Sequence, residues 1–174
     1  MNMKAAILTA SDRCARGEQR DESGQALYAA MRARGAEIAA YEIVPDDVER
    51  IAAKLREMAD MGVQVILTTG GTGIAATDVT PEATRQVLER EVPGIAEAMR
   101  AASLASTPHA MLSRAVAGVR GRTLIINLPG SPKGAWQCLQ VVLPVLEHAV
   151  ELLQGPVPDE SHRPPPGWNT PETR

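Results

Sequence analysis

The sequence predicts a single α/β domain, and this prediction depends on three observations. The chain has 174 residues, a length typical of one domain. Hydrophobic residues make up 44% of it and charged residues 22%, a composition that can bury a core and that excludes disorder for most of the chain. Short apolar runs rich in β-branched residues lie at about 4–10, 37–44, 63–69 and 122–128, and helical patterns separate them. Such an alternation is typical of helices packed on a sheet.

The segment 47–61 predicts an amphipathic helix between the second and third strands. Its apolar residues Val48, Ile51, Leu55 and Met58 recur at spacings of three and four, while charged residues fall on the opposite side. Asp47 stands directly before the first turn and suits the N-cap. The helix should therefore pack on one face of the sheet.

The third strand is predicted to lie in the middle of the sheet, because Val63–Leu67 is nearly continuous in apolar residues. After the strand at 122–128, Ser131 suits an N-cap and Pro132 the first helical position. A long C-terminal helix that covers the sheet follows from the spacing of Trp136, Leu139, Leu143, Leu146, Val150 and Leu153. Pro144 should kink or restart this helix.

The chain changes character after Gly155. Residues 156–174 are polar, carry many prolines and show no apolar periodicity. We therefore expect one domain over residues 1–155 and a Pro-rich C-terminal tail over residues 156–174 that is extended and lies outside the core.

Composition excludes several functional classes. A net charge of −3, an aromatic content of 2% and the absence of Phe disfavour nucleic-acid binding. The apolar start of the chain is too short for a signal peptide, and no run approaches the roughly 20 apolar residues of a membrane span. Cys14 and Cys138 lack the spacing of a zinc site and read as small core residues in a reducing compartment. A cytoplasmic protein without membrane or nucleic-acid partners is expected.

The loop Thr68–Gly73 follows the third strand directly and is a candidate phosphate-binding loop. Its three glycines let main-chain N–H groups approach an anion, and its hydroxyls add donors. The alternative is an ordinary turn that needs glycine for its backbone angles. The segment also fits the loose dinucleotide-binding pattern G-x-G-x-x-A, but no helix opens immediately after it. The first good helix start is Thr80 as N-cap with Pro81 after it.

Two further loops should meet the glycine loop at the same edge of the sheet. Asn127–Gly134 precedes a predicted helix, whose free N–H groups, together with Lys133, suit a phosphate. Ser11–Arg13 follows the first strand and supplies a hydroxyl, a carboxylate and a guanidinium, although it could equally be a surface turn. Two anion-binding loops suggest a polyphosphate or two phosphorylated ligands.

Asp46 and Asp78 are two carboxylates that could face a ligand at this edge. Asp46 follows the second strand and Asp78 continues the glycine loop. Either could be a helix cap or turn residue, and Asp47 is the better cap of the helix that begins at Val48. A carboxylate beside phosphates is favourable when a cation such as Mg²⁺ lies between them.

Four motifs in order give the chain a recognisable resemblance: Thr68–Gly73, Asp78–Ala83, Ser113–Gly118 and Asn127–Lys133. Together they resemble the motif series of the molybdenum-cofactor proteins of the MogA, MoaB and gephyrin G-domain family, over residues 4 to about 155. This resemblance implies a three-layer α/β fold with a mixed, mostly parallel sheet flanked by helices, and a homotrimer.

The resemblance also implies an activity: adenylyl transfer from ATP to molybdopterin with Mg²⁺, which gives adenylyl-molybdopterin and pyrophosphate. A separate molybdate-insertion protein would use the product. Asp46 and Asp78 match the two essential, metal-binding aspartates. The implied substrate- and nucleotide-binding residues are Ser11, Arg13, Thr69, Gly70, Gly71, Thr72, Gly73, Thr80, Glu82, Ser113, Arg114, Pro129, Gly130, Ser131, Lys133 and Gly134. The alternatives are a MoaB-type paralogue with little of this activity, or a pterin-binding scaffold module.

Overall fold

A six-stranded sheet forms the centre of the computed structural model, which describes residues 3–155. The strand order is β2-β1-β3-β6-β5-β4. The strands are β1 (Lys4–Ala10), β2 (Glu37–Val44), β3 (Val65–Thr69), β4 (Arg90–Glu91), β5 (Ala117–Arg120) and β6 (Thr123–Leu128). β2, β1, β3 and β6 run parallel, whereas β5 and β4 are antiparallel additions at one edge. The mixed, mostly parallel sheet is confirmed.

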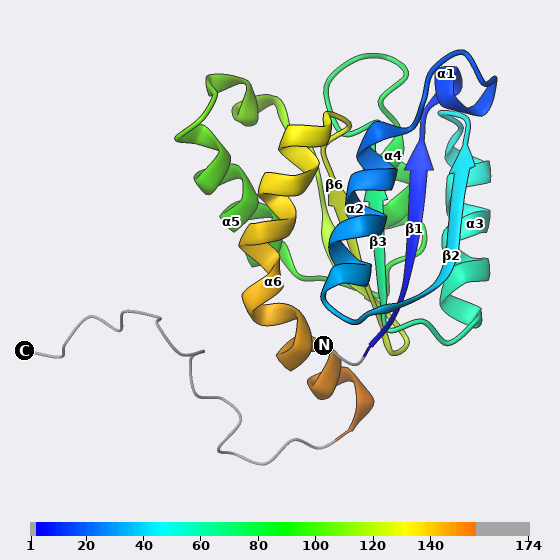
Figure 1. Cartoon of the computed structure of the whole chain (residues 1–174), viewed down its shortest axis with the longest axis vertical. Coiled ribbons are helices and arrows are strands. Elements are labelled where there is room, and N and C mark those ends of the chain that lie inside the picture. The colour runs from blue at the N-terminus through cyan, green and yellow to red at the C-terminus, as the bar shows by residue number, and fades with distance from the viewer. Residues whose placement is uncertain (1–2, 156–174) are drawn as a thin grey trace, which may run out of the picture.

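Helices cover both faces of this sheet, as Figure 1 shows. They are α1 (Asp12–Ala15), α2 (Glu22–Ala33), α3 (Val48–Asp60), α4 (Thr80–Arg85), α5 (Pro93–Leu104), the 3₁₀ helix η1 (Pro108–Leu112) and α6 (Pro132–Gln154). α2, α5 and α6 contribute to the core on one face, and α3 and α4 to the core on the other. The three-layer prediction is therefore confirmed. No helix within residues 3–155 is long and apolar enough to cross a membrane.

The four strands predicted from apolar runs are all present. β1 and β2 have the predicted bounds, while β3 begins at Val65 and β6 at Thr123. β3 is buried along its whole length between β1 and β6, as its continuous apolar character predicted. The short antiparallel strands were not located from the sequence.

Helix α3 follows its predicted pattern. Ile51, Leu55 and Met58 are fully buried, and the Asp47 carboxylate accepts a hydrogen bond from Arg50 N at 2.8 Å, which makes Asp47 the N-cap.

Helix α6 departs from its prediction in two respects. Ser131 caps it as expected, accepting from Gly134 N at 3.1 Å. The helix runs through Pro144 as one element, so the predicted restart is wrong; Pro144 is exposed, where water can reach the carbonyl that lacks its donor. Trp136 is half exposed, because the smaller residues Ala135 and Cys138 form the buried side of the first turns instead. The Pro-rich tail lies outside the described residues.

The parallel strands bring four loops to one edge of the sheet, at the top of Figure 1. The loops after β1, β2, β3 and β6 begin at Ser11, Pro45, Gly70 and Pro129. This edge therefore collects the predicted ligand-binding loops, at the position where open α/β sheets bind ligands.

Candidate functional site

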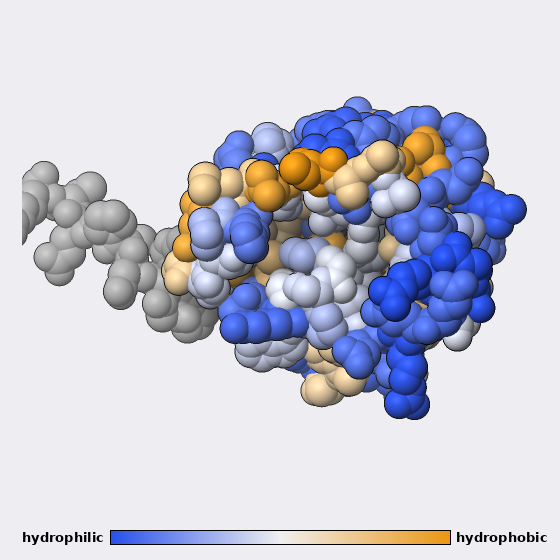
Figure 2. Space-filling view, turned by 90° about the horizontal axis from the view of Figure 1, so that it is seen from above, coloured by the Kyte–Doolittle hydropathy of each residue, from blue (hydrophilic) through white to orange (hydrophobic). Residues whose placement is uncertain are grey.

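Within the part of the chain that the structure describes, residues 3–155, this edge carries a smaller and a larger cavity, and Asp78 lines both of them. The smaller cavity, of about 230 Å³, lies between the loops after β1, β2 and β3. The larger, of about 470 Å³, lies between the glycine loop, α5, η1 and the start of α6. Figure 2, which views this edge from above, shows a hollowed centre with hydrophobic residues along its upper rim and hydrophilic residues on its right side. The arrangement offers room for two ligands that meet at one carboxylate.

The glycine loop needs its first two glycines for the fold itself. Gly70 and Gly71 have φ of 93° and 64°, in the left-handed region that favours glycine. A Cβ on Gly70 would clash with the Ala10 carbonyl oxygen, and one on Gly71 with Thr80 Oγ1. The turn therefore needs these two glycines, and both also line the smaller cavity; phosphate binding by this loop stays a prediction.

Gly73 differs from these two glycines. It has no positive φ, and an added Cβ would lie 2.8 Å from Asp78 Oδ2. A side chain here would displace the Asp78 carboxylate. Gly73 and Thr72 line the larger cavity.

The hydroxyls of Thr69 and Thr80 point into the protein. Thr69 Oγ1 donates to Pro129 O at 2.7 Å and joins the two predicted anion-binding loops. Thr80 Oγ1 donates to Gly70 O at 2.9 Å, and Thr80 is fully buried. Val79 is the N-cap of α4 and makes no side-chain cap bond, so the predicted cap role of Thr80 is wrong. The Thr80 hydroxyl bonds to the glycine loop instead. Neither threonine is among the residues that line the two cavities.

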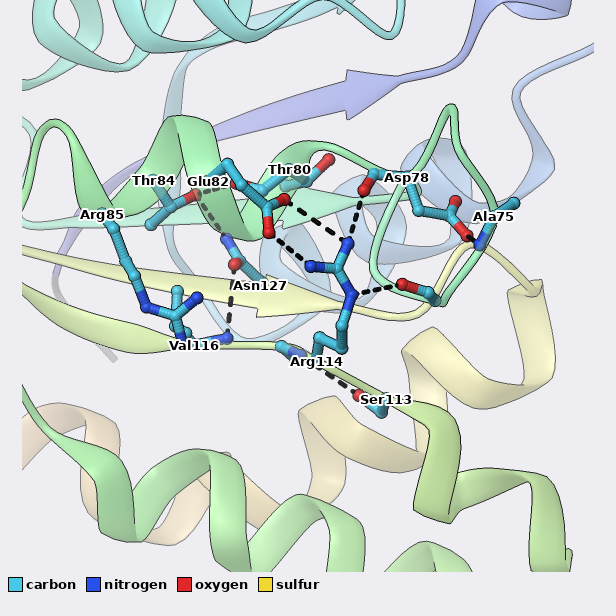
Figure 3. A network of polar contacts seen from close by, with 12 residues as sticks. Ala75, Asp78, Thr80, Glu82, Thr84, Arg85, Ser113, Arg114, Val116 and Asn127 are labelled. Atoms are coloured by element: carbon cyan, nitrogen blue, oxygen red, sulfur yellow. Dashed lines mark hydrogen bonds and ion pairs between the residues drawn. The ribbon is translucent and has the colours of Figure 1, made fainter.

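The buried side-chain amide of Asn127, in β6, forms hydrogen bonds that link the sheet to the residues supporting the glycine loop. Asn127 Nδ2 donates to Thr68 Oγ1 and to Thr84 Oγ1, each at 2.9 Å, and Asn127 Oδ1 accepts from Val116 N at 3.3 Å. Thr84 Oγ1 in turn donates to Thr80 O at 2.8 Å. Figure 3 shows Asn127 between Thr84 and Val116. A chain of hydrogen bonds thus leads from the core to the glycine loop.

Asp46 faces the smaller cavity and is held by the loop after β1. Its Oδ2 accepts from Asp12 N at 2.9 Å, and its own N donates to Asp12 Oδ1 at 3.0 Å. Burial raises the pKa of Asp46, and the negative charges of Asp12 and Asp78 raise it further. Two carboxylates from different loops therefore share one cavity, and a cation between them would lower their mutual repulsion.

Asp78 closes a tight turn and also reaches the cavities. Its Oδ2 accepts from Ala75 N at 2.9 Å, and its N donates to Ala75 O at 2.9 Å. The turn-forming reading of Asp78 is thus correct, and it is compatible with a ligand-facing position because the side chain lines both cavities.

The two carboxylates suit Mg²⁺ better than a metal held by protein alone. Within residues 3–155 no group of three or more His, Cys, Asp or Glu side chains could hold a metal ion. Mg²⁺ is usually bound by one or two carboxylates, with water and substrate phosphates as the remaining ligands. Asp46 and Asp78 are the residues that could hold it.

Arg114 and Glu82, both expected to bind ligand, bind each other. The Arg114 guanidinium pairs with the Glu82 carboxylate and donates to Gly73 O at 2.7 Å and to Asp78 O. The Arg114 bond is the main reason that the pKa of Glu82 is lowered. Neither residue is among those lining the cavities.

The remaining predicted residues divide between the two cavities and the surface. Ser11 and Gly130 line the smaller cavity, with Cys14, which is half-buried rather than part of the core. Ser113 lines the larger cavity, together with Pro129, Ser131 and Gly134. Arg13 and Lys133 are exposed and are not among the lining residues of either cavity.

Sequence reasoning missed Asp21, a buried carboxylate at the smaller cavity. It accepts from Thr9 Oγ1 and Tyr41 OH, each at 2.6 Å, and from Gly24 N at 2.9 Å as the N-cap of α2. Burial, followed by the hydrogen bond to Asp21, raises the pKa of Tyr41. The sequence signal that could have located Asp21 is an aspartate in the N-cap position directly before the weakly amphipathic helix α2.

The apolar wall of the larger cavity was also missed. Ala96 and Met99 of α5 form it with Ala110 and Leu112 of η1, and Cys138 of α6 completes it. Two of the three segments, α5 and η1, were not located from the sequence.

Comparisons with known proteins agree with this geometry. A family model described as "Probable molybdopterin binding domain" matches residues 6–148. Molybdopterin adenylyltransferase of Helicobacter pylori strain J99 is 42% identical over 153 residues, which cover 86% of this chain and 86% of that protein. Gephyrin of Dictyostelium discoideum is 42% identical over 170 residues, but the chain spans only 24% of that longer protein.

Solved structures show the same fold. The molybdopterin biosynthesis enzyme MoaB from Thermus thermophilus matches with a TM-score of 0.82 and 55% identity, over 88% of this chain and 98% of that one. The Mog protein from Mycobacterium ulcerans matches with a TM-score of 0.83 and 40% identity, over 87% of this chain and 99% of that one. The resemblance carried by the four motifs is thereby confirmed, and the chain belongs to the molybdopterin-binding domain family.

Proposed function

We propose that this protein is a molybdopterin adenylyltransferase, which transfers the adenylyl group of ATP to the terminal phosphate of molybdopterin and releases pyrophosphate. One observation supports this most: Asp46 and Asp78, from two different loops, face one cavity, and Asp78 also lines a second. A reaction between two phosphorylated substrates needs two adjoining spaces and a charged centre between them. The proposal is also supported by the relative from Helicobacter pylori, which is 42% identical and is named molybdopterin adenylyltransferase.

The reaction requires alignment and charge neutralisation. A terminal phosphate oxygen of molybdopterin attacks the α-phosphorus of ATP, one P–O bond forms, and the bond to the β-phosphate oxygen breaks as pyrophosphate leaves. The attacking oxygen is already ionised, so no side chain needs to act as a nucleophile. Mg²⁺, when bound at Asp46 and Asp78, would neutralise charge on the reacting phosphates.

The chain's own groups fix the geometry. The Asp46 carboxylate is oriented by Asp12 N and the Asp78 carboxylate by Ala75 N, so both are held before substrate arrives. Ser131 and Gly134, at the start of the 23-residue helix α6, line the larger cavity, where the positive end of the helix dipole favours an anionic group. The apolar wall formed by α5 and η1 suits a ring system.

A second candidate is the MoaB-type paralogue, since the Thermus thermophilus MoaB is 55% identical to this chain. Such a protein would bind the pterin with little adenylyl transfer. The presence of both Asp46 and Asp78 at one cavity favours the active enzyme, because a binding module has no need for a pair of carboxylates beside phosphates. A pterin-binding scaffold module is the third alternative.

The wider setting is part of the same proposal. Residues 1–155 form the catalytic domain, which assembles as a homotrimer in the cytoplasm, and a separate molybdate-insertion protein takes up the adenylyl-molybdopterin. Sedimentation gives the oligomeric state directly.

The deciding experiment is a pyrophosphate-release assay with ATP, Mg²⁺ and molybdopterin, with product identified by mass. The proposal requires pyrophosphate release that depends on molybdopterin and yields adenylyl-molybdopterin in equal amount. Binding of molybdopterin without turnover would favour the paralogue instead.

A further inference from the structure

We propose that Arg114 is a positioning residue that acts on Asp78: its guanidinium clamps both ends of the loop 73–78 and so places the Asp78 carboxylate at the junction of the two cavities. The inference rests on the proposed function in that it concerns the same site. It differs from the expectation that Arg114 contacts substrate directly.

The clamp is a set of bonds from one side chain to both ends of a loop. Arg114 Nε donates to Gly73 O at 2.7 Å, and Nη2 donates to Asp78 O. The same guanidinium pairs with Glu82, which lies on α4. The main-chain N of Arg114 adds a bond to Thr72 O at 2.8 Å. Figure 3 shows the guanidinium between Glu82 and the glycine loop.

The loop depends on this clamp because packing holds it weakly. Residues 74–77 are exposed, and Ile74 is 67% exposed. Within the loop, Asp78 and Ala75 bond to each other, which fixes the shape of the turn but not its position on the protein. The bonds to Gly73 O and Asp78 O fix that position. A shift of Asp78 by about 1 Å is enough to lower a phosphoryl-transfer rate by about 10²-fold.

Only an arginine can make this set of contacts. A guanidinium presents donors in a planar fork that reaches two carbonyls and a carboxylate together, whereas an ammonium is a single point charge. Glu82 receives two guanidinium nitrogens and therefore orients the fork. With its donors directed at Gly73, Asp78 and Glu82, Arg114 is not among the residues lining either cavity.

Three variants test the inference on the whole chain. Arg114→Lys keeps the charge but loses the fork, and Glu82→Gln leaves Arg114 in place while weakening its orientation. Arg85→Lys is the matched control, because the Arg85–Glu91 pair has similar side-chain exposure (49% and 45%, against 37% and 46% for Arg114 and Glu82). Arg85, in the last turn of α4, bonds to Glu91 of β4 rather than to the loop 73–78. Each variant is measured for kcat, for the Kd of Mg-ATP, and for hydrogen exchange of the amides in residues 73–79.

The expected result for Arg114→Lys is a fall in kcat of about 10²-fold, a Kd for Mg-ATP within about threefold of the wild type, and faster exchange over residues 73–79. Glu82→Gln should change the same two quantities in the same direction by less, and Arg85→Lys should change neither. A large loss of Mg-ATP affinity with unchanged exchange overturns the inference, since Arg114 would then be a substrate contact. Unchanged exchange and unchanged kcat overturn it as well. If the wild type proves inactive, the proposed function fails, and the exchange rates of the three variants still decide whether the clamp exists.

Discussion

Asp12 and Asp46 hold each other through reciprocal hydrogen bonds between main chain and carboxylate. Asp12 N donates to Asp46 Oδ2 at 2.9 Å, and Asp46 N donates to Asp12 Oδ1 at 3.0 Å. The two residues follow β1 and β2, which pair in parallel, so the sheet brings their loops together. Burial raises the pKa of Asp46 most, and the charges of Asp12 and Asp78 also raise it, whereas the hydrogen bond from Asp12 N lowers it; the net direction is upward.

The first prediction is that Asp46→Asn stabilises the fold at neutral pH while abolishing most activity. The pKa of Asp46 is raised on folding from an ordinary value of 3.8, so the folded state holds its proton more tightly than the unfolded state. The free energy of unfolding therefore falls as the pH rises through that raised pKa, and Asn escapes this loss. Tm should be higher for the variant at pH 7, and the two proteins should converge near pH 3.

Asp47→Asn is the control for this prediction. Asp47 is an exposed N-cap whose carboxylate accepts from Arg50 N, and Asn serves equally well there. Its Tm and turnover should match the wild type. A Tm difference for Asp46→Asn that does not change with pH would contradict the electrostatic explanation.

The second prediction separates two glycines of one loop. Gly71→Ala should lower the free energy of unfolding by about 1–3 kcal/mol, because φ is 64° and the new Cβ meets Thr80 Oγ1. Gly73→Ala should leave stability nearly unchanged but reduce turnover, because its Cβ meets the Asp78 carboxylate. Urea unfolding and steady-state kinetics measure the two effects. Equal losses of stability for both variants would show that Gly73 too is required by the fold.

The third prediction concerns the buried amide of Asn127. Asn127→Leu removes the partners of Thr68, Thr84 and Val116 and should lower the free energy of unfolding by about 2 kcal/mol or more. Gln86→Leu is the control and should cost little, because it removes only a 3.4 Å bond between two exposed side chains, from Gln86 at the end of α4 to Glu49 of α3. A loss for Asn127→Leu no larger than for the control would mean that the network adds nothing to stability.

The sequence predicted the parts of the fold that rest on strong local patterns. Continuous apolar runs located the four parallel strands, and the Ile51–Leu55–Met58 stripe located α3. It did not locate α5, which buries only Ala96 and Met99, or the two-residue strand β4. Elements with so little buried apolar surface take their structure from tertiary contacts, and a local pattern carries little information about them.

The sequence predicted which loops meet at the candidate site, but not which atoms their side chains contact. Because parallel strands end at one edge, the sequence placed Asp46, Asp78 and the glycine loop together correctly. It could not tell which side chains bond to the protein itself instead of a ligand: Thr80 bonds to Gly70 O, and Arg114 bonds to Glu82. The direction of a side chain in a loop depends on partners that are distant in the sequence. Glu82 and Arg114, for example, are 32 residues apart.

The most direct test of the central claim is single-turnover formation of adenylyl-molybdopterin by Asp78→Asn, measured by rapid quench beside titrations of Mg-ATP and molybdopterin. Asn retains an oxygen that accepts from Ala75 N, so the turn should survive, while the charge that would hold Mg²⁺ is lost. We predict near-normal binding of both ligands and a rate lowered by about 10²-fold or more. A rate close to that of the wild type would contradict the claim that Asp78 is a metal-binding catalytic residue at the junction of the two cavities.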